Sequence, residues 1–261
     1  MGSEDSVSRA ERQVCHAGRP VTKVRPRPVP AGRTGSLRCG AMAARSDRRD
    51  FTQAPLRGRV EAFLLSVGAP ADEKLMGDRK RATIGTLTGT VVEFGPGPGG
   101  NMGYYGPDVH LIAVEPNPAM HDRLREAADR HGVDMEIRTQ HGEDLDLPDG
   151  SADAVVGTLL LCGVDDPAMV VEQIKRVLRP GGTYVFFEHV VAEAGSGTRR
   201  LQRVVAGPHR WLFNGCELDR DTGALLREAG FTDIDIEPID AGPGAVWTRP
   251  RIFGRAIRER F

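Results

Sequence analysis

The stretch VVEFGPGPGGN, residues 91–101, joins a short apolar run to a glycine-rich turn. The apolar residues predict a strand over 90–94, and a helix is expected to begin near Asn101. A glycine loop between a strand and a helix lets a polar or negatively charged ligand group approach bare backbone N–H groups. Pro96 and Pro98 stiffen the turn because proline fixes φ. The stretch therefore predicts an α/β fold with a ligand site where this strand ends.

The spacing of the glycines fits two known patterns. Gly95, Gly97 and Gly100 fit the GxGxxG of dinucleotide-binding proteins. Gly95, Gly97 and Gly99, preceded by Glu93, fit the ExGxGxG of enzymes that use a methyl donor. A single match to either pattern is weak, so the spacing alone leaves both ligands open.

Strand and helix patterns alternate along most of the chain, with short connections between them. The predicted strands cover 90–94, 110–115, 135–139, 154–158, 183–189 and 251–256, with an alternating apolar segment over 231–239. The predicted helices cover 72–86, 119–131, 167–177 and 221–229, after a helical apolar face over 60–67. Such alternation predicts a parallel sheet with helices on both faces.

Two acids and two later blocks favour the methyl donor. Glu93 stands two residues before the first glycine, where dinucleotide-binding proteins usually continue an apolar strand. Glu115 ends the next predicted strand, where a carboxylate can accept hydrogen bonds from both ribose hydroxyls of a nucleoside. The block GEDLDLPDGSAD (142–153) leads into a strand, and VLRPGGTYVFFEH (177–189) makes a Pro-Gly-Gly turn into another. Together they favour S-adenosylmethionine as the ligand.

These blocks resemble those of the class I S-adenosylmethionine-dependent methyltransferases, in the group that includes the quinone-biosynthesis C-methyltransferases. The segments that carry the resemblance are EFGPGPG (93–99), EPNP (115–118), GEDLDLPDGSAD (142–153), TLLLC (158–162) and RVLRPGG (176–182). The match is closer still to the methyltransferase-like alkyl thiol S-methyltransferases, through VVGTLLLCGV (155–164), FFEHV (186–190), HRWLFNGCELDRDT (209–222) and RPRIFGRAI (249–257). That family begins with a hydrophobic membrane anchor and this chain begins with a polar, basic segment, so the membrane association does not carry over.

The resemblance, which covers roughly residues 74–261, implies the fold and the donor site. The fold expected is a Rossmann-like, seven-stranded, mostly parallel sheet with helices on both faces and a reversed C-terminal hairpin. The donor residues implied are Glu93, Gly95, Gly97, Gly99 and Asn101 at the methionine half, Glu115, Pro116 and Asn117 at the ribose and adenine, Glu143 and the backbone of Asp144 at the adenine amino group, and Thr158 and Leu159 at the sulfonium.

The acceptor side offers fewer signals. Methyl transfer is an in-line displacement, and alignment of the two reactants can lower the barrier by about 7–11 kcal/mol, so a general base is optional. Candidate bases are His189, at the end of a predicted strand, and His209 together with Asn214. The alternatives are that His189 hydrogen-bonds a covering segment and that His209 lies on the surface. A cap over about 194–217 is expected to roof the site with its aromatic residues.

The four cysteines, Cys15, Cys39, Cys162 and Cys216, show neither a CxxC motif nor metal-ligand spacing. No metal site and no disulfide framework are therefore predicted, and a cytoplasmic location is expected. Cys162 lies in an apolar run with no histidine or other base near it in sequence, so packing is favoured over nucleophilic catalysis.

The N-terminal residues differ in composition from the rest. Residues 1–41 contain eight Lys or Arg and three Asp or Glu, a charge of +5, so the remainder of a chain of net charge -1 carries -6. Residues 1–50 show no apolar period and predict a disordered basic leader, with Met42 as an alternative start. This leader has no aromatic residue and no basic helical face, which argues against a nucleic-acid arm. Ala154–Val164, the longest hydrophobic uncharged stretch, is about half of the ~20 residues that a membrane span needs.

The function predicted is transfer of a methyl group from S-adenosylmethionine to a small molecule, with a thiol as the specific hypothesis, by a domain over 51–261. The alternatives are C- or O-methylation of a quinone-like or natural-product acceptor. Alternatives of another class are an NAD(P)-binding oxidoreductase and a non-catalytic donor-binding protein. The sequence leaves open whether the protein is a monomer or a dimer.

Overall fold

The structure is a computed structural model that describes residues 73–213, 215–242 and 245–260. The predicted leader over 1–50, the alternative start at Met42 and the helical face over 60–67 lie outside these residues. No helix in the described part of the chain is long and apolar enough to cross a membrane.

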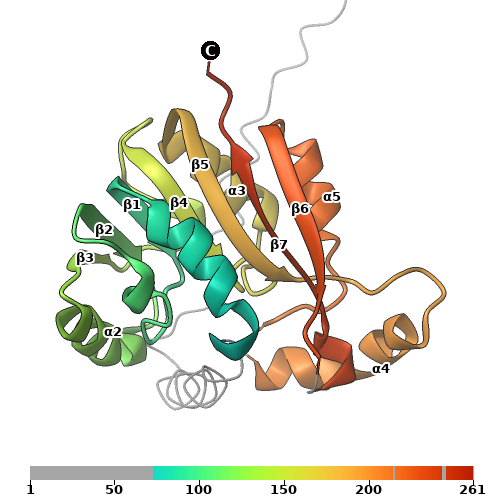
Figure 1. Cartoon of the computed structure of the whole chain (residues 1–261). Coiled ribbons are helices and arrows are strands. Elements are labelled where there is room, and N and C mark those ends of the chain that lie inside the picture. The colour runs from blue at the N-terminus through green and yellow to red at the C-terminus, as the bar shows by residue number, and fades with distance from the viewer. Residues whose placement is uncertain (1–72, 214, 243–244, 261) are drawn as a thin grey trace, which may run out of the picture. The chain divides into compact units, whose positions relative to one another are not determined.

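A seven-stranded sheet of order β3-β2-β1-β4-β5-β7-β6 forms the centre of the fold (Figure 1). Its strands are β1 (Gly89–Phe94), β2 (Val109–Val114), β3 (Asp134–Arg138), β4 (Ala152–Thr158), β5 (Leu178–His189), β6 (Thr232–Asp240) and β7 (Pro250–Ile257). The first five pair in parallel, whereas β7 runs antiparallel to both β5 and β6. The predicted mostly parallel sheet with a reversed C-terminal hairpin is confirmed.

Helices cover both faces of the sheet because the strands carry apolar side chains on both of their faces. Val92 packs in a core with α3 (Pro167–Val177) and α5 (Thr222–Glu228), and Val91 packs in a second core with α2 (Pro118–His131) and the helix that includes residues 73–83. Strands buried on both faces are typical of parallel α/β sheets. The prediction of helices on both faces is therefore confirmed.

The helix expected to begin near Asn101 does not form, so this prediction was wrong. Only a short 3-10 turn, Met102–Tyr104, lies between β1 and β2. Glycines at 99, 100, 103 and 106 crowd this connection, and each glycine in a helix interior costs about 1 kcal/mol relative to alanine. The glycine loop therefore passes to β2 through a turn.

The cap segment contains a helix that the sequence patterns did not predict. Helix α4 (Gly197–Leu212) fills most of the predicted cap, with Ser196 capping its N-terminus by accepting from the Arg199 N–H at 3.1 Å. The buried Gln202 ties this helix to the sheet edge, because its amide Nε2 donates to the carbonyl oxygens of Val190 at 3.2 Å and Trp247 at 3.0 Å.

Candidate active site

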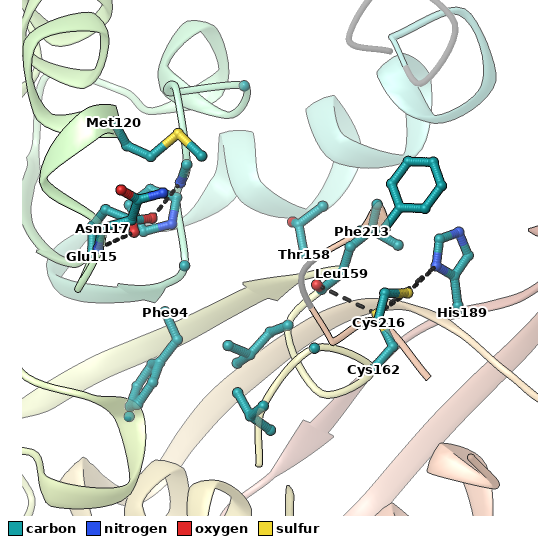
Figure 2. A pocket seen from close by; sticks show the side chains of 18 of the residues that line it. Phe94, Glu115, Asn117, Met120, Thr158, Leu159, Cys162, His189, Phe213 and Cys216 are labelled. Carbon is teal, nitrogen blue, oxygen red and sulfur yellow. Dashed lines mark hydrogen bonds between the residues drawn. The ribbon is translucent and has the colours of Figure 1, made fainter. Parts of the chain in front are cut away.

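A cavity of about 500 Å³ lies at the carboxyl ends of β1, β2, β4 and β5. Its walls include the glycine loop after β1 and Glu115 after β2, and Figure 2 shows Glu115 and Asn117 on one side of it with Cys162, His189 and Cys216 on the other. Ligands of open α/β sheets bind at this edge. Two chemically different ends therefore share one cavity of a volume usual for small-molecule sites.

The glycine loop bends toward the cavity through left-handed backbone angles. Gly95 and Gly97 have φ of 64° and 57°, and both line the cavity. Glycine adopts such angles without the steric cost that other residues incur. Gly99 does not line the cavity, and a Cβ atom there would lie 2.7 Å from Cβ of Ala127 on α2. Gly99 thus permits the loop to pack against this helix.

Glu115 fixes the loop beside the cavity. Its Oε2 accepts from the Gly97 N–H at 3.0 Å and its Oε1 from the Asn117 N–H at 2.8 Å. Asn117 in turn caps α2 through a hydrogen bond that its side chain accepts from the Ala119 N–H at 3.0 Å. Glu115, Pro116 and Asn117 all line the cavity. Because each carboxylate oxygen can accept more than one hydrogen bond, Glu115 retains acceptor capacity for ligand hydroxyls.

Glu93 lies in the floor beneath the loop. Its carboxylate is buried and accepts from Asn101 Nδ2 at 2.7 Å and from the Tyr105 hydroxyl at 2.8 Å. Burial raises the pKa of Glu93, although the hydrogen bonds from Tyr105 and Asn101 oppose that shift. Asn101 Nδ2 also donates to Thr158 Oγ1 at 3.0 Å. Glu93 therefore orients the side chain of Asn101 at the end of the glycine loop.

The buried Oδ1 atom of Asn101 is an acceptor that a ligand such as the methyl donor could satisfy. It has no hydrogen-bond partner among the described residues, although Asn101 lines the cavity. A buried acceptor without a partner costs about 1–3 kcal/mol, and an ammonium group such as that of S-adenosylmethionine would satisfy it. The residues present therefore fit the donor, and the assignment of Asn101 and the glycine loop to its methionine half and of Glu115 to its ribose stays a prediction.

The residues expected near the adenine differ in their placement. Glu143 is buried and lines the cavity, and its Oε1 accepts from the Asp166 N–H at 3.4 Å. Asp144 is exposed and does not line the cavity, and its backbone N–H already donates to the His141 carbonyl at 3.0 Å. Glu143 is thus the one of the two with access to a ligand.

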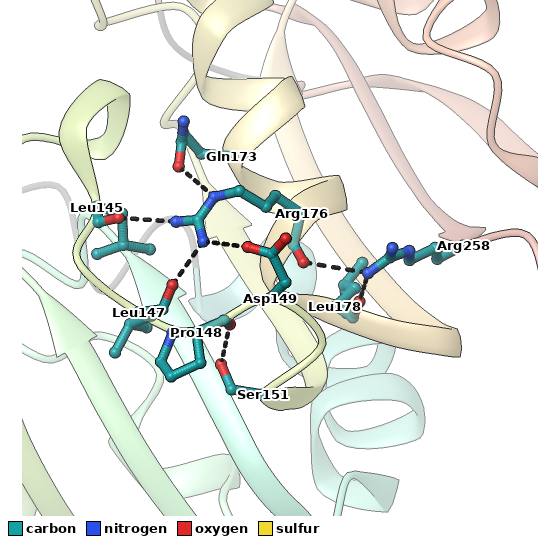
Figure 3. A network of polar contacts seen from close by, with 9 residues as sticks. All are labelled: Leu145, Leu147, Pro148, Asp149, Ser151, Gln173, Arg176, Leu178 and Arg258. Carbon is teal, nitrogen blue, oxygen red and sulfur yellow. Dashed lines mark hydrogen bonds and ion pairs between the residues drawn. The ribbon is translucent and has the colours of Figure 1, made fainter.

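Arg176 on α3 holds the loop that follows Glu143 (Figure 3). Its guanidinium donates to the carbonyl oxygens of Leu145 at 2.7 Å and Leu147 at 2.5 Å, and to the side chains of Asp149 at 2.7 Å and Gln173 at 2.9 Å. A planar guanidinium is suited to such a set because its N–H donors point in fixed directions. Arg176 therefore connects this loop to the helix below it.

Replacing Arg176 with alanine is expected to lower the free energy of unfolding by about 2–3 kcal/mol, because two carbonyl oxygens lose a charged donor. Chemical denaturation of the full chain measures this change. Arg125→Ala is the control, since the pair of Arg125 with Asp122 is exposed and such pairs contribute less than about 1 kcal/mol. Equal stability of the two variants would contradict the assigned role.

Thr158 and Leu159 line the middle of the cavity, where the sulfonium is expected. Leu159 has a φ of 53°, an uncommon conformation for a residue other than glycine. Its N–H donates to the Phe187 carbonyl at 2.6 Å, and its carbonyl accepts from Cys162 Sγ at 3.5 Å. The turn after β4 therefore leads from the predicted sulfonium position to Cys162.

Cys162, His189 and Cys216 meet at the other end of the cavity. Cys216 Sγ lies 3.6 Å from Cys162 Sγ and 3.6 Å from His189 Nδ1, and Cys162 Sγ lies 3.8 Å from the same nitrogen (Figure 2). His209, on α4, is also buried and lines the cavity, with its ring centroid 4.4 Å from that of Phe213. Asn214, the third candidate for the acceptor side, lies outside the described residues.

The aromatic residues of the cap were expected to roof the acceptor end, and only some of them do. Leu212 and Phe213 line the cavity, whereas Trp211 does not and is 74% exposed. The residues Trp247 and Arg251, from the C-terminal part of the chain, also line it. The predicted cap therefore contributes part of the roof and shares it with the turn before β7 and the first residues of that strand.

Glu188 lies behind the cysteines and was not recognised in the sequence. Its fully buried carboxylate accepts from the N–H groups of Leu160, Leu161 and Cys162 at 3.0, 2.8 and 3.3 Å. Burial raises the pKa of Glu188 to about 8, against the effect of these three donors. An acid within the apolar run VFFEHV was the available signal, because acids are rarely buried unless they are paired.

The two thiols have opposite electrostatic environments. The pKa of Cys216 is lowered by its hydrogen bond with Cys162 and further by His189 and His209. The pKa of Cys162 is raised by the same contact with Cys216 and by burial. Spacing along the chain did not reveal this contact, because Cys162 and Cys216 are 54 residues apart.

The chain is similar to known methyltransferases in sequence and fold. The family model described as "Methyltransferase domain" matches residues 92–186. Thiol S-methyltransferase TMT1B of Homo sapiens is 34% identical over 217 residues, which cover 78% of this chain and 88% of that protein. Thiol S-methyltransferase TMT1A of Homo sapiens is 34% identical over 172 residues, covering 65% and 70% respectively.

Solved structures support the fold. A SAM-dependent methyltransferase from Aquifex aeolicus aligns with a TM-score of 0.54 at 16% identity, over 76% of this chain and 98% of that chain. A Haemonchus contortus phosphoethanolamine N-methyltransferase, solved in complex with S-adenosylhomocysteine, aligns with a TM-score of 0.56 at 14% identity, over 74% and 57%. The family match decides between the two ligands that the glycine spacing left open, in favour of S-adenosylmethionine. This protein belongs to the class I S-adenosylmethionine-dependent methyltransferases and transfers a methyl group to a small-molecule acceptor.

Proposed function

We propose that this methyltransferase acts on the sulfur atom of a small thiol. Two human relatives that are 34% identical to the chain are named thiol S-methyltransferases, and the chain covers 88% of one and 70% of the other. The sequence blocks that resemble this family outside the general donor-binding pattern include 209–222 and 249–257, and both contribute residues to the acceptor end of the cavity.

The observation that carries this proposal is the composition of the acceptor end. Two sulfur atoms and two imidazole rings, from Cys162, Cys216, His189 and His209, lie beside the apolar ring of Phe213. Apolar walls with a few polar groups suit a small, largely apolar acceptor and leave little room for a polymer.

The donor supplies an electrophilic methyl group on a positively charged sulfur atom. The chain has to align the acceptor with that carbon and exclude water, and alignment alone can lower the barrier by about 7–11 kcal/mol. The fixed loop at Glu115 and the covered acceptor end provide these two functions. A thiol of pKa ~8.5 is only a few per cent thiolate at neutral pH, so a group that favours the thiolate would raise the rate. That His189 or His209 assists this ionisation stays a prediction.

A screen of matched acceptors tests the proposal. The purified full chain is incubated with S-adenosylmethionine and pairs of compounds that differ only in sulfur and oxygen, such as thiophenol and phenol. Formation of S-adenosylhomocysteine and the mass of the methylated product are measured. Thiols are expected to turn over at least about 30-fold faster, because even an ordinary thiol of pKa ~8.5 ionises about 30 times more than a phenol of pKa ~10 at neutral pH, and an aromatic thiol ionises more still. Turnover confined to oxygen or carbon acceptors would refute S-methylation.

A further inference from the structure

We propose that Cys162, His189 and Cys216 form a zinc site at the acceptor end of the cavity, with a fourth position open to the acceptor thiol. Zinc binding depends on these three residues alone, whereas the part of the metal in methyl transfer rests on the proposed S-methylation.

The distances among the three donor atoms match those around a tetrahedral zinc ion. Zn–S bonds of about 2.3 Å and Zn–N bonds of about 2.0–2.1 Å, at tetrahedral angles, place two sulfurs about 3.8 Å apart and a sulfur and a nitrogen about 3.6 Å apart. In this chain the Sγ atoms of Cys162 and Cys216 are 3.6 Å apart, and they lie 3.8 and 3.6 Å from His189 Nδ1. One ion could therefore contact all three atoms with little movement.

Three separate elements bring these donors together and hold them. Cys162 lies in the turn after β4, where its N–H donates to Glu188. His189 is the last residue of β5. Cys216 follows α4, and the next residue, Glu217, donates its N–H to the Cys162 carbonyl at 2.7 Å. The backbone around each ligand is thus fixed before any ion binds, as metal sites require.

The chemistry of the cluster fits zinc better than a hard cation. Two thiols and an imidazole are the ligands that select zinc or another soft metal over magnesium or calcium. Two thiolates and a neutral imidazole around Zn²⁺ give a site without net charge, which lowers the cost of its burial. The two sulfurs are 3.6 Å apart, so the structure describes two thiols, and a disulfide with its S–S bond of about 2.05 Å is the competing arrangement that the experiment has to exclude.

The position of the cluster indicates a catalytic type of site. Structural zinc sites have four protein ligands, whereas catalytic sites have three and leave one position for water or substrate. Cys162, His189 and Cys216 all line the cavity, so the open position is accessible to an acceptor. A thiol that coordinates zinc loses its proton, which would make the acceptor a thiolate at neutral pH.

The reaction then needs no reactant other than the acceptor thiol and S-adenosylmethionine. The acceptor thiol binds the zinc and releases its proton to solvent. An electron pair of the thiolate sulfur forms a bond to the methyl carbon, while the bond from that carbon to the donor sulfonium breaks and its electron pair stays on the donor sulfur. The products are a methyl thioether, S-adenosylhomocysteine and one proton. The thioether is a neutral and weaker ligand, so it leaves the metal.

Metal analysis of the purified full chain tests the site. After growth with zinc and removal of loosely bound metal, the wild type is expected to hold about one zinc per chain, and Cys162→Ser and Cys216→Ser less than about a tenth of that. Cys15→Ser/Cys39→Ser is the matched control, because it also removes thiols, and it is expected to keep the metal. Calorimetry with S-adenosylmethionine shows whether each variant is folded, since the donor end is separate from these cysteines. A wild-type chain without zinc, or zinc retained by both Cys162→Ser and Cys216→Ser, would overturn the proposal.

Cobalt substitution gives a second measurement that needs no variant. Co²⁺ bound by two thiolates is expected to show thiolate-to-cobalt charge-transfer absorption that saturates at one equivalent, and a small thiol acceptor is expected to change the ligand-field bands. Absence of charge-transfer absorption, or a Cys162–Cys216 disulfide in the freshly purified protein, would contradict a metal site. If zinc binds but only oxygen or carbon acceptors are methylated, the metal site stands and S-methylation fails. Equal thiol turnover by zinc-free and zinc-loaded protein would overturn the catalytic part.

Discussion

Replacing Glu115 with alanine is expected to weaken the binding of S-adenosylmethionine by at least about 100-fold. The carboxylate is buried and accepts from the N–H groups of Gly97 and Asn117, so its removal leaves two buried donors without a partner and frees the loop. It also removes the carboxylate that is predicted to accept hydrogen bonds from the ribose hydroxyls. Hydrogen bonds to a charged group contribute about 1.5–3 kcal/mol each, and about 2.7 kcal/mol corresponds to 100-fold in affinity.

Isothermal titration calorimetry of the full chain measures this loss. Glu115→Gln keeps one acceptor oxygen and is expected to lose about 10-fold, between the wild type and Glu115→Ala. Glu126→Ala removes an exposed acid from α2, the helix that follows Glu115, and is expected to bind the donor as the wild type does. If Glu115→Ala unfolds as cooperatively as the wild type and binds the donor with unchanged affinity, the assignment of Glu115 to the donor is wrong.

Replacing Glu188 with alanine is expected to lower the free energy of unfolding by about 3–5 kcal/mol. The three N–H groups of Leu160, Leu161 and Cys162 would lose their acceptor, and a buried donor without a partner costs about 1–3 kcal/mol. The side chain is fully buried, so its removal also leaves a cavity that water enters poorly. The turn that places Cys162 at the acceptor end would then lose its support.

Urea denaturation of Glu188→Ala, Glu188→Gln and Glu172→Ala checks this role. Glu188→Gln retains an acceptor oxygen and is expected to recover about half of the loss. Glu172 is exposed on α3, and its replacement is expected to change the free energy of unfolding by less than about 0.5 kcal/mol. A Glu188→Ala protein within about 1 kcal/mol of the wild type would show that the turn is held by other contacts.

The donor end could be predicted from the sequence because its signals are local. The spacing of glycines and acids around Gly95, the acid at the end of the next strand and the alternation of strands with helices can each be recognised within a short window. The carboxyl ends of parallel strands meet at one edge, so Glu93 and Glu115 had to lie near the same cavity. The helix expected at Asn101 does not form because several glycines make a helix there unfavourable, and a short 3-10 turn connects the loop to β2.

The acceptor end was decided by the tertiary structure. Cys162 is 27 residues from His189 and 54 from Cys216, and no spacing rule connects them. They meet because β4 pairs in parallel with β5, with Thr158 beside Phe187, so that the turn after β4 and the end of β5 lie at the same edge, and because α4 returns the chain to that edge. The sequence by itself determined the fold class and placed the glycine loop, Glu93 and Glu115 at one edge of the sheet, since local periodicity and strand-end positions encode them. Only strand register and the path of the cap could bring two cysteines and a histidine to one point, because side chains distant in sequence gain their contacts from packing.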